Sequence, residues 1–178
     1  MNSERWPPCY DAEELQQNIR ELVSKNQLHT SFFTANTSQG LCQGDILKLS
    51  AEMPLIDEHG NVAALELFDY WMFVGNTCDT DRVDVLTSQV VPLHDLGGLQ
   101  SHEITNLERY SLNRRFFVPN WPGSPHQAWV LEFTELCAAS LDFLKKQTVV
   151  ARMQRYSWYL LHSCLVRYLA RDDGRFDE

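Results

Sequence analysis

Hydrophobic and polar positions in the middle of the chain follow the pattern of β-strands. Apolar or alternating segments occupy residues 45–50, 65–74, 83–91, 115–119 and 128–133. The run from Tyr70 to Val74 is continuous rather than alternating, which is typical of a strand buried on both faces. Gly44 precedes the first segment, and Pro92 is expected to end the third. The pattern predicts a small antiparallel sheet.

Helical spacing occurs on both sides of these segments. Apolar residues from Leu15 to Val23 recur three or four positions apart and predict an amphipathic helix over residues 12–25. A longer stripe from Val149 to Tyr168 predicts a C-terminal helix over residues 148–171. A third helix is expected over residues 101–112, and a connecting loop over residues 26–43.

These segments predict a single α+β domain over residues 1–178. Its core would be a small, strongly bent antiparallel sheet or an SH3-like β-barrel over residues 43–137, with the N-terminal and C-terminal helices packed around it. A hydrophobic content of 44% and a charged content of 22% are ordinary for a globular protein. Since the sequence has neither a membrane-spanning apolar run nor a signal-peptide pattern, we expect a cytoplasmic protein without membrane association.

Charge and cysteine content narrow the expected partners. The net charge is −9, but the last 34 residues carry seven basic and four acidic side chains. The acidic body suits a basic protein partner, whereas the basic C-terminal helix could approach nucleic acid or pack on the body itself. Five scattered cysteines without a CxxC pair indicate reduced thiols. A homodimer is compatible with this composition.

Cys78 and Asp79 directly follow the buried strand over residues 65–74 and form the first candidate site. A cysteine nucleophile needs a base or a positive charge nearby, but the neighbours of Cys78 are Asp79, Asp81 and Asp84. Because these carboxylates disfavour a thiolate, a buried structural thiol is the favoured interpretation. Asp79-Thr80-Asp81 begins like a calcium loop but lacks its later Gly and Glu, so no metal is expected.

Arg114 and Arg115 form a second candidate site, immediately before two phenylalanines. Two guanidinium groups beside aromatic rings can hold a phosphate or stack on bases, and they can equally pair with internal carboxylates. The chain contains none of the common nucleotide-binding, serine-hydrolase or zinc-protease motifs. No cofactor is therefore expected.

The order of the segments resembles that of MazF/PemK-type toxins. The resemblance covers residues 43–92 and rests on Gly44-Asp45-Ile46-Leu47, on the strand ending in Val74-Gly75-Asn76, and on Leu86-Thr87-Ser88 before Val90-Val91-Pro92. It implies an SH3-like barrel and RNA cleavage by an Arg and a Thr, and the Thr maps onto Thr87. Residues 66–70 supply no Arg, so Arg114 or Arg115 would have to provide the cation that stabilises the transition state.

The chain is also similar to uncharacterised bacterial and phage proteins with a Gly-Asp-Ile strand, a Thr-Cys-Asp segment and an Arg-aromatic-x-Pro strand. That similarity implies no activity. We therefore expect a non-enzymatic binding or regulatory module of a bacterial or mobile-element system, of the toxin–antitoxin or phage-defence type. Its expected binding residues are Cys78, Asp79, Thr87, Ser88, Arg114 and Arg115. The alternative is a metal-independent ribonuclease with Thr87 and Arg115 in its site, and a thiol enzyme at Cys78 is a third hypothesis.

Overall fold

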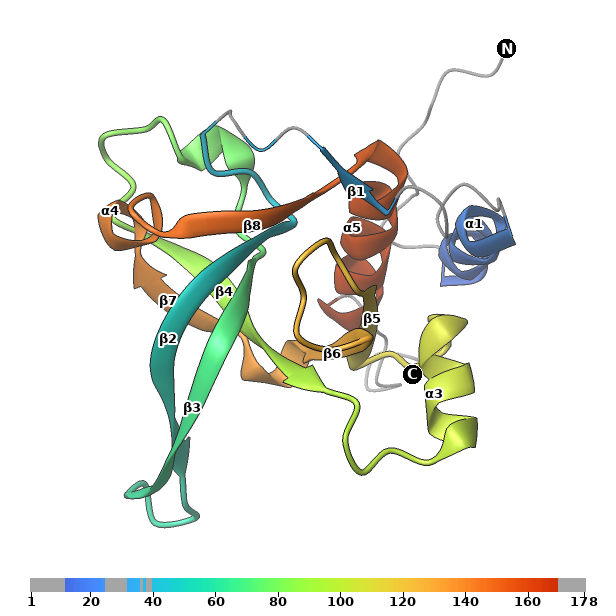
Figure 1. The fold of residues 1–178 in the computed structure, drawn as a ribbon, viewed down its shortest axis with the longest axis horizontal. Helices are drawn as coiled ribbons and strands as arrows, with labels where there is room; N and C mark the ends of the chain where they lie inside the picture. Colours follow the sequence, from blue (N-terminus) through green and yellow to red (C-terminus); the bar gives the residue numbers. More distant parts are fainter. Residues whose placement is uncertain (1–11, 25–31, 36, 38–39, 170–178) are drawn as a thin grey trace, which may run out of the picture.

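A computed structural model of the protein describes residues 12–24, 32–35, 37 and 40–169. Its α+β fold confirms the fold class expected from the sequence (Figure 1). The strands are β1 (Phe33–Thr34), β2 (Asp45–Ile56), β3 (Val62–Phe73), β4 (Thr87–Asp95), β5 (Arg115–Pro119), β6 (Ala128–Glu132), β7 (Cys137–Ser140) and β8 (Thr148–Met153). The helices are α1 (Ala12–Ser24), α3 (Ser101–Glu108), α4 (Leu141–Leu144) and α5 (Arg155–Leu169), with 3-10 turns η1 (Thr77–Asp79) and η2 (Phe133–Glu135).

The eight strands form one antiparallel sheet in the order β1-β8-β2-β3-β4-β6-β5, and β7 pairs with β4. Strand β4 is the junction: Val90 pairs with Phe73 of β3 on one edge and with Cys137 of β7 on the other. Within the described residues the sheet is open, with β1 and β5 at its two ends, so a closed barrel is not shown. The sheet also extends beyond the expected core range, because β1 and β8 lie outside residues 43–137.

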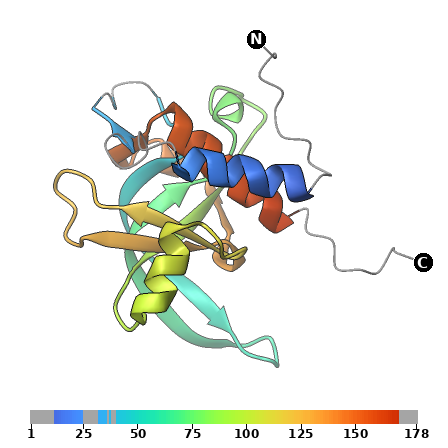
Figure 2. The ribbon, with the colours of Figure 1, turned by 90° about the vertical axis from the view of Figure 1, so that its right-hand side faces the viewer.

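Two hydrophobic clusters hold the fold together. The larger one lies between the sheet and two helices, where Ile19 of α1 and Leu160 of α5 are fully buried with Phe116 of β5. Helix α1 packs against α5, as Figure 2 shows. The smaller cluster places Phe73 of β3 against Leu144 of α4 on the other side of the sheet. None of the helices in the described ranges is long and apolar enough to cross a membrane.

The C-terminal region differs from its predicted form. Residues 148–153 were expected at the start of the last helix, but they form β8, which pairs with β2 and β1. The β-branched run Thr148-Val149-Val150 favours a strand, and pairing on both sides satisfies its backbone. The helix itself begins at Arg155. By contrast, the helix predicted at 12–25 and the strands predicted at 115–119 and 128–133 are confirmed over their described residues.

The third predicted strand also lies elsewhere than expected. Residues 83–86 are outside β4, and the side chains of Val83 and Leu86 are 96% and 76% exposed. Strand β4 runs through Pro92 and ends at Asp95, so the expectation that Pro92 ends the strand is wrong. A proline is tolerated there because it lies between two ladders on the edge of β4 away from β3, where pairing with β7 ends at Val90 and pairing with β6 begins at Leu93.

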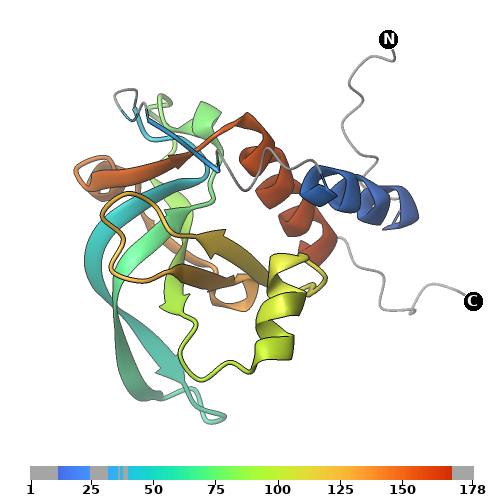
Figure 3. The same cartoon turned by 45° about the vertical axis from the view of Figure 1, so that its right-hand side comes forward.

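The hairpin of β2 and β3 extends well beyond the rest of the sheet. We call residues 50–69 the arm, and Figure 3 shows it projecting from the body. Residues 53–63, whose Pro, Gly and Asn favour an extended loop or a hairpin tip, form the outer end of this hairpin, with Met53 in β2 and Ala63 in β3. The turn at the tip is stabilised by Asp57 Oδ1, which accepts hydrogen bonds from the backbone N–H groups of His59 and Asn61.

Candidate groove between strands β3 and β4

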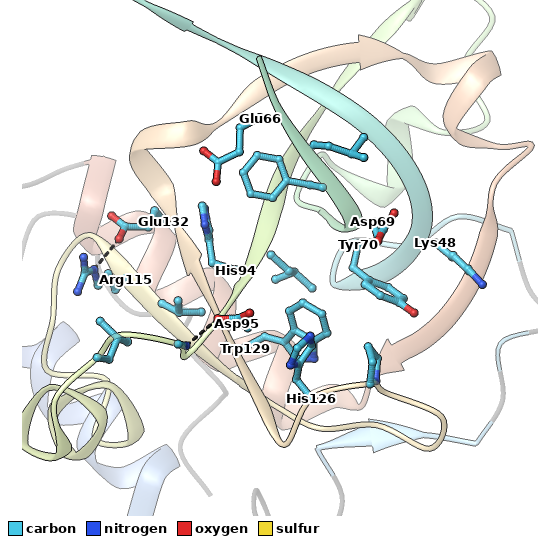
Figure 4. A pocket seen from close by; sticks show the side chains of 17 residues that line it. Lys48, Glu66, Asp69, Tyr70, His94, Asp95, Arg115, His126, Trp129 and Glu132 are labelled. Carbon is cyan, nitrogen blue, oxygen red and sulfur yellow. Dashed lines mark hydrogen bonds and ion pairs between the residues drawn. The ribbon is translucent and has the colours of Figure 1, made fainter. Parts of the chain in front are cut away.

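A groove opens where β3 and β4 separate. The two strands pair only from Trp71 with Pro92 to Phe73 with Val90. Beyond Pro92, β4 pairs with β6 on its opposite edge and has no partner on the β3 side among the described residues. Strands β6 and β7 are joined by residues 133–136, so both lie along the same edge of β4 and leave its β3-facing edge open. The opening has a volume of about 750 Å³ (Figure 4).

Charged and aromatic side chains share the lining of this groove. Its carboxylates are Glu66, Asp69, Asp95 and Glu132, its cations are Lys48 and Arg115, and its rings are those of Phe68, Tyr70, His94, His126 and Trp129. Figure 4 shows Glu66, His94 and Glu132 directed toward the same part of the groove. The local sequence explains one wall, because alternation along β3 places Glu66, Phe68 and Tyr70 on one face.

Arg115 is held by carboxylates of the protein itself. Its Nε atom donates to Glu132 Oε1 at 2.7 Å, and its Nη1 atom lies 3.9 Å from Glu103 Oε1. Arg115 and Glu132 are paired residues of β5 and β6, so the strand register itself brings the two groups together. This ion pair offsets the charge of Glu132 as well as that of Arg115. The groove carboxylates left without a cationic partner among the described residues are Glu66, Asp69 and Asp95.

His94 of β4 lines the groove and is paired with Glu135 of η2. Its Nε2 atom lies 2.5 Å from Glu135 Oε2, and its ring packs edge-on against Phe68 with 4.8 Å between centroids. The hydrogen bond to Glu135 raises the pKa of His94, burial opposes this rise, and the charges of Glu66 and Glu132 reinforce it. Surrounding carboxylates therefore favour a protonated imidazole in the groove.

An aromatic cluster joins Tyr70 of the β3 wall to Trp129 of β6. Tyr70 lies 5.2 Å from Trp129 and 5.4 Å from Trp121, measured between ring centroids, and the two indoles stack at 5.4 Å. Trp121 and Trp129 are almost completely buried, whereas Tyr70 is half-buried. Trp129 Nε1 donates to Ser124 Oγ at 2.9 Å, which fixes the indole. The buried indoles therefore support the ring of Tyr70, and Tyr70 is the member of this cluster on which an aliphatic or cationic side chain can pack.

Of the residues expected from the sequence to form the site, Arg115 alone lines this groove. Arg114 lines an adjoining cavity of about 560 Å³, to which Arg115 and Glu132 also contribute. The carbonyl of Arg114 accepts a hydrogen bond from the Phe133 N–H group at 2.8 Å, which fixes the backbone at this point.

The remaining expected site residues gather at the opposite end of β4. Ser88 is buried beside Gly75, and Thr87 is exposed and paired with Ser140 of β7. Cys78 is exposed on η1, so the expectation of a buried thiol is wrong. Asp79, next to it, lies 3.7 Å from Arg82 Nη1.

The structure does not bring Thr87 and Arg115 together. Arg115 pairs with Glu132 of β6. The residue before Glu132, Leu131, pairs with Leu93 of β4, so Glu132 and Arg115 lie level with Pro92. Thr87 is five residues earlier on β4, about 16 Å along the strand. The chain therefore has two separate polar regions. The site expected from the sequence did not include Glu66, His94 or Glu132. The acidic and aromatic residues among positions 66–70 were the sequence feature that could have indicated this groove.

Two arginines of the basic C-terminal region are internal, while Lys145, Lys146 and Arg155 are exposed. Arg152 is buried against Asp45, and Arg167 donates to the carbonyls of Tyr110 and Leu112 at 2.9 Å. Arg155 is exposed and donates to the hydroxyl of Tyr159 at 2.8 Å. Within the described ranges, no three His, Cys, Asp or Glu side chains are arranged to hold a metal ion.

Comparison with models of known protein families finds no family that matches this chain, and comparison with curated proteins also finds no match.

Proposed function

We propose that this protein is a binding module whose groove takes a segment of another protein that carries lysine or arginine side chains. The observation that carries the proposal is the charge of the groove: with Arg115–Glu132 and His94–Glu135 each counted as an ion pair, the carboxylates of Glu66, Asp69 and Asp95 remain against the single ammonium group of Lys48. The proposal keeps the binding module expected from the sequence and assigns its binding surface to the groove.

The groove supplies both interactions that a basic side chain needs. Carboxylates such as Glu66 and Asp95 can pair with its ammonium or guanidinium head, while the half-buried ring of Tyr70, supported by Trp129, can pack against its aliphatic stem. Asp95 is fixed for this role, because its Oδ1 atom accepts the N–H group of Gly97 at 2.6 Å. Nucleic acid is disfavoured at the same place, since phosphates would meet these carboxylates.

The test is a titration with octalysine, octaglutamate and an eight-nucleotide single-stranded RNA, followed by tryptophan fluorescence at low salt. We expect octalysine alone to bind, with an affinity that falls as salt is added. The double variant Glu66→Gln/Asp95→Asn should weaken octalysine binding at least tenfold. The matched control Glu13→Gln/Glu108→Gln removes two exposed carboxylates outside the groove and should change the affinity less than twofold.

Three results would overturn the proposal. The first is equal octalysine affinity for the groove variant, the control variant and the unaltered protein. The second is tighter binding of the RNA than of octalysine. The third is cleavage of total RNA that survives EDTA and is lost in Thr87→Ala, which would establish the ribonuclease that the MazF/PemK resemblance implies.

A further inference from the structure

The outer edge of strand β3 is unpaired along most of its length. Strand β3 pairs with β4 only over Trp71–Phe73, so residues 62–70 pair with β2 alone in the described part of the chain. A free strand edge presents a row of backbone N–H and C=O groups that a further strand can bind. Residues 66–70 of this edge also form one wall of the groove.

The two faces of β3 differ along this edge. Glu66, Phe68 and Tyr70 lie on one face, whereas Leu65, Leu67 and Asp69 lie on the other, where Leu65 and Leu67 are 58% and 63% exposed. At the tip, Ile56 and Val62 are each 58% exposed as well. A strand added to β3 would therefore meet Glu66 and Tyr70 on one face, and two exposed leucines with Asp69 on the other.

The charge of the arm favours a basic strand over a second copy of this chain. No Lys or Arg occurs between Lys48 and Arg82, while the arm carries Glu52, Asp57, Glu58, Glu66 and Asp69. Two such arms placed edge to edge would bring carboxylates against carboxylates, which is destabilising. A segment with alternating basic and aliphatic residues complements both faces.

We infer that a segment of a partner protein binds as an added β-strand on the edge formed by residues 62–70, with Lys or Arg at alternate positions facing the groove and aliphatic residues between them. This inference rests on the proposed function of the groove and adds the conformation and sequence pattern of the bound segment. Backbone hydrogen bonds to β3 would supply affinity, and the alternating side chains would supply specificity.

The test uses the capped peptide Lys-Val-Lys-Thr-Lys-Val-Lys-Thr and two N-methylated forms of it, one methylated at the odd positions and one at the even positions. An added strand donates its N–H groups to β3 along one edge only. One methylated form should therefore bind at least tenfold more weakly than the parent peptide, and the other less than threefold more weakly. On saturation, amide exchange at alternate residues of 62–70 should slow at least tenfold, while residues 51–56 of β2 serve as the internal control.

Two exposed leucines provide a matched pair of variants. Leu67→Lys places a positive charge beside the bound strand and should weaken the peptide at least tenfold. Leu86→Lys makes the same change at a leucine outside the arm and should have less than a twofold effect.

The outcomes separate this inference from the proposed function. In one outcome, binding depends on Glu66 and Asp95 but is insensitive to both methylation patterns and leaves amide exchange at residues 62–70 unchanged. This outcome overturns the added strand and leaves the groove function standing. Failure of every basic peptide to bind overturns the groove function and the inference with it. Light scattering could instead show a dimer of this protein that dissociates when the peptide is added. A second copy would then occupy the β3 edge, which also overturns the inference.

Discussion

Trp71 of β3 is paired with Pro92 of β4, and this is the last pair before the two strands separate. Past this point β4 is joined to β6, and β3 continues into the arm with β2 as its sole partner among the described residues. The groove and the free edge of β3 both follow from this separation. A proline fits at this position because it lies between the β7 ladder, which ends at Val90, and the β6 ladder, which begins at Leu93.

The first prediction concerns the buried ion pair of Asp45 and Arg152, which joins the start of β2 to β8. Arg152 Nε and Nη2 each lie 2.7 Å from an oxygen of Asp45, which is fully buried. We expect Asp45→Ala to reduce the free energy of unfolding by about 3–5 kcal/mol, because it leaves a buried guanidinium without its counter-ion. Chemical denaturation measures this change.

The matched control is the double variant Asp45→Asn/Arg152→Met, which removes both charges. It should be less destabilised than the sum of the losses in Asp45→Asn alone and Arg152→Met alone, because neither charge is left buried without its partner. Additive losses in the double variant would contradict a direct coupling between the two side chains.

The second prediction is a pH dependence of stability set by His94 and Glu135. The hydrogen bond that His94 donates to Glu135 raises the pKa of His94 in the folded protein. The stabilisation from this pair is therefore fully present below about pH 6.5 and is lost as the pH rises through the raised value. Glu135→Gln should reduce the free energy of unfolding by about 1 kcal/mol at pH 6 and by much less at pH 9. Glu13→Gln should show no such difference, and an equal loss for Glu135→Gln at both pH values would rule out the pair.

The third prediction concerns the close approach of Gly75 to Ser88. A Cβ atom at position 75 would lie 1.8 Å from Ser88 Oγ and 3.1 Å from Ser88 Cβ. Since Ser88 is buried and has little room to move, Gly75→Ala should reduce the free energy of unfolding by about 1–3 kcal/mol. Adding Ser88→Ala removes the hydroxyl and should recover part of this loss. The absence of any recovery, measured by thermal unfolding, would show that the clash is not the cause.

The fourth prediction compares cysteine reactivities. Cys78 is exposed, whereas Cys164 is fully buried and burial raises its pKa to about 12. Iodoacetamide at pH 7.5 should therefore label Cys78 at least a hundredfold faster than Cys164 in the folded protein, as peptide mass spectrometry would measure. If Cys78 reacted at pH 6 faster than free cysteine does, it would be an activated thiolate, and the thiol-enzyme hypothesis would regain support.

The sequence alone determined the α+β class and several elements whose signals are local. The three- and four-residue spacing from Leu15 to Val23 predicted α1, and short apolar segments next to turn residues predicted β5 and β6. These elements could be predicted because burial of one face requires a fixed period along the chain. The signals near residue 148 were mixed, and the strand β8 was missed because its partners, β1 and β2, are about a hundred residues away.

The candidate site could not be predicted in the same way, because its parts come from distant strands. Thr87 and Ser88 looked adjacent to Arg115 only under the assumption of a compact barrel, and the strand order separates them. Glu66, His94 and Glu132 share one groove because β3 leaves β4 at Pro92 and β4 then pairs with β6. Local sequence determined the face on which each side chain lies, since alternation along a strand is a property of the strand itself. Tertiary structure decided which faces meet, because strand pairing depends on contacts between segments far apart in the chain.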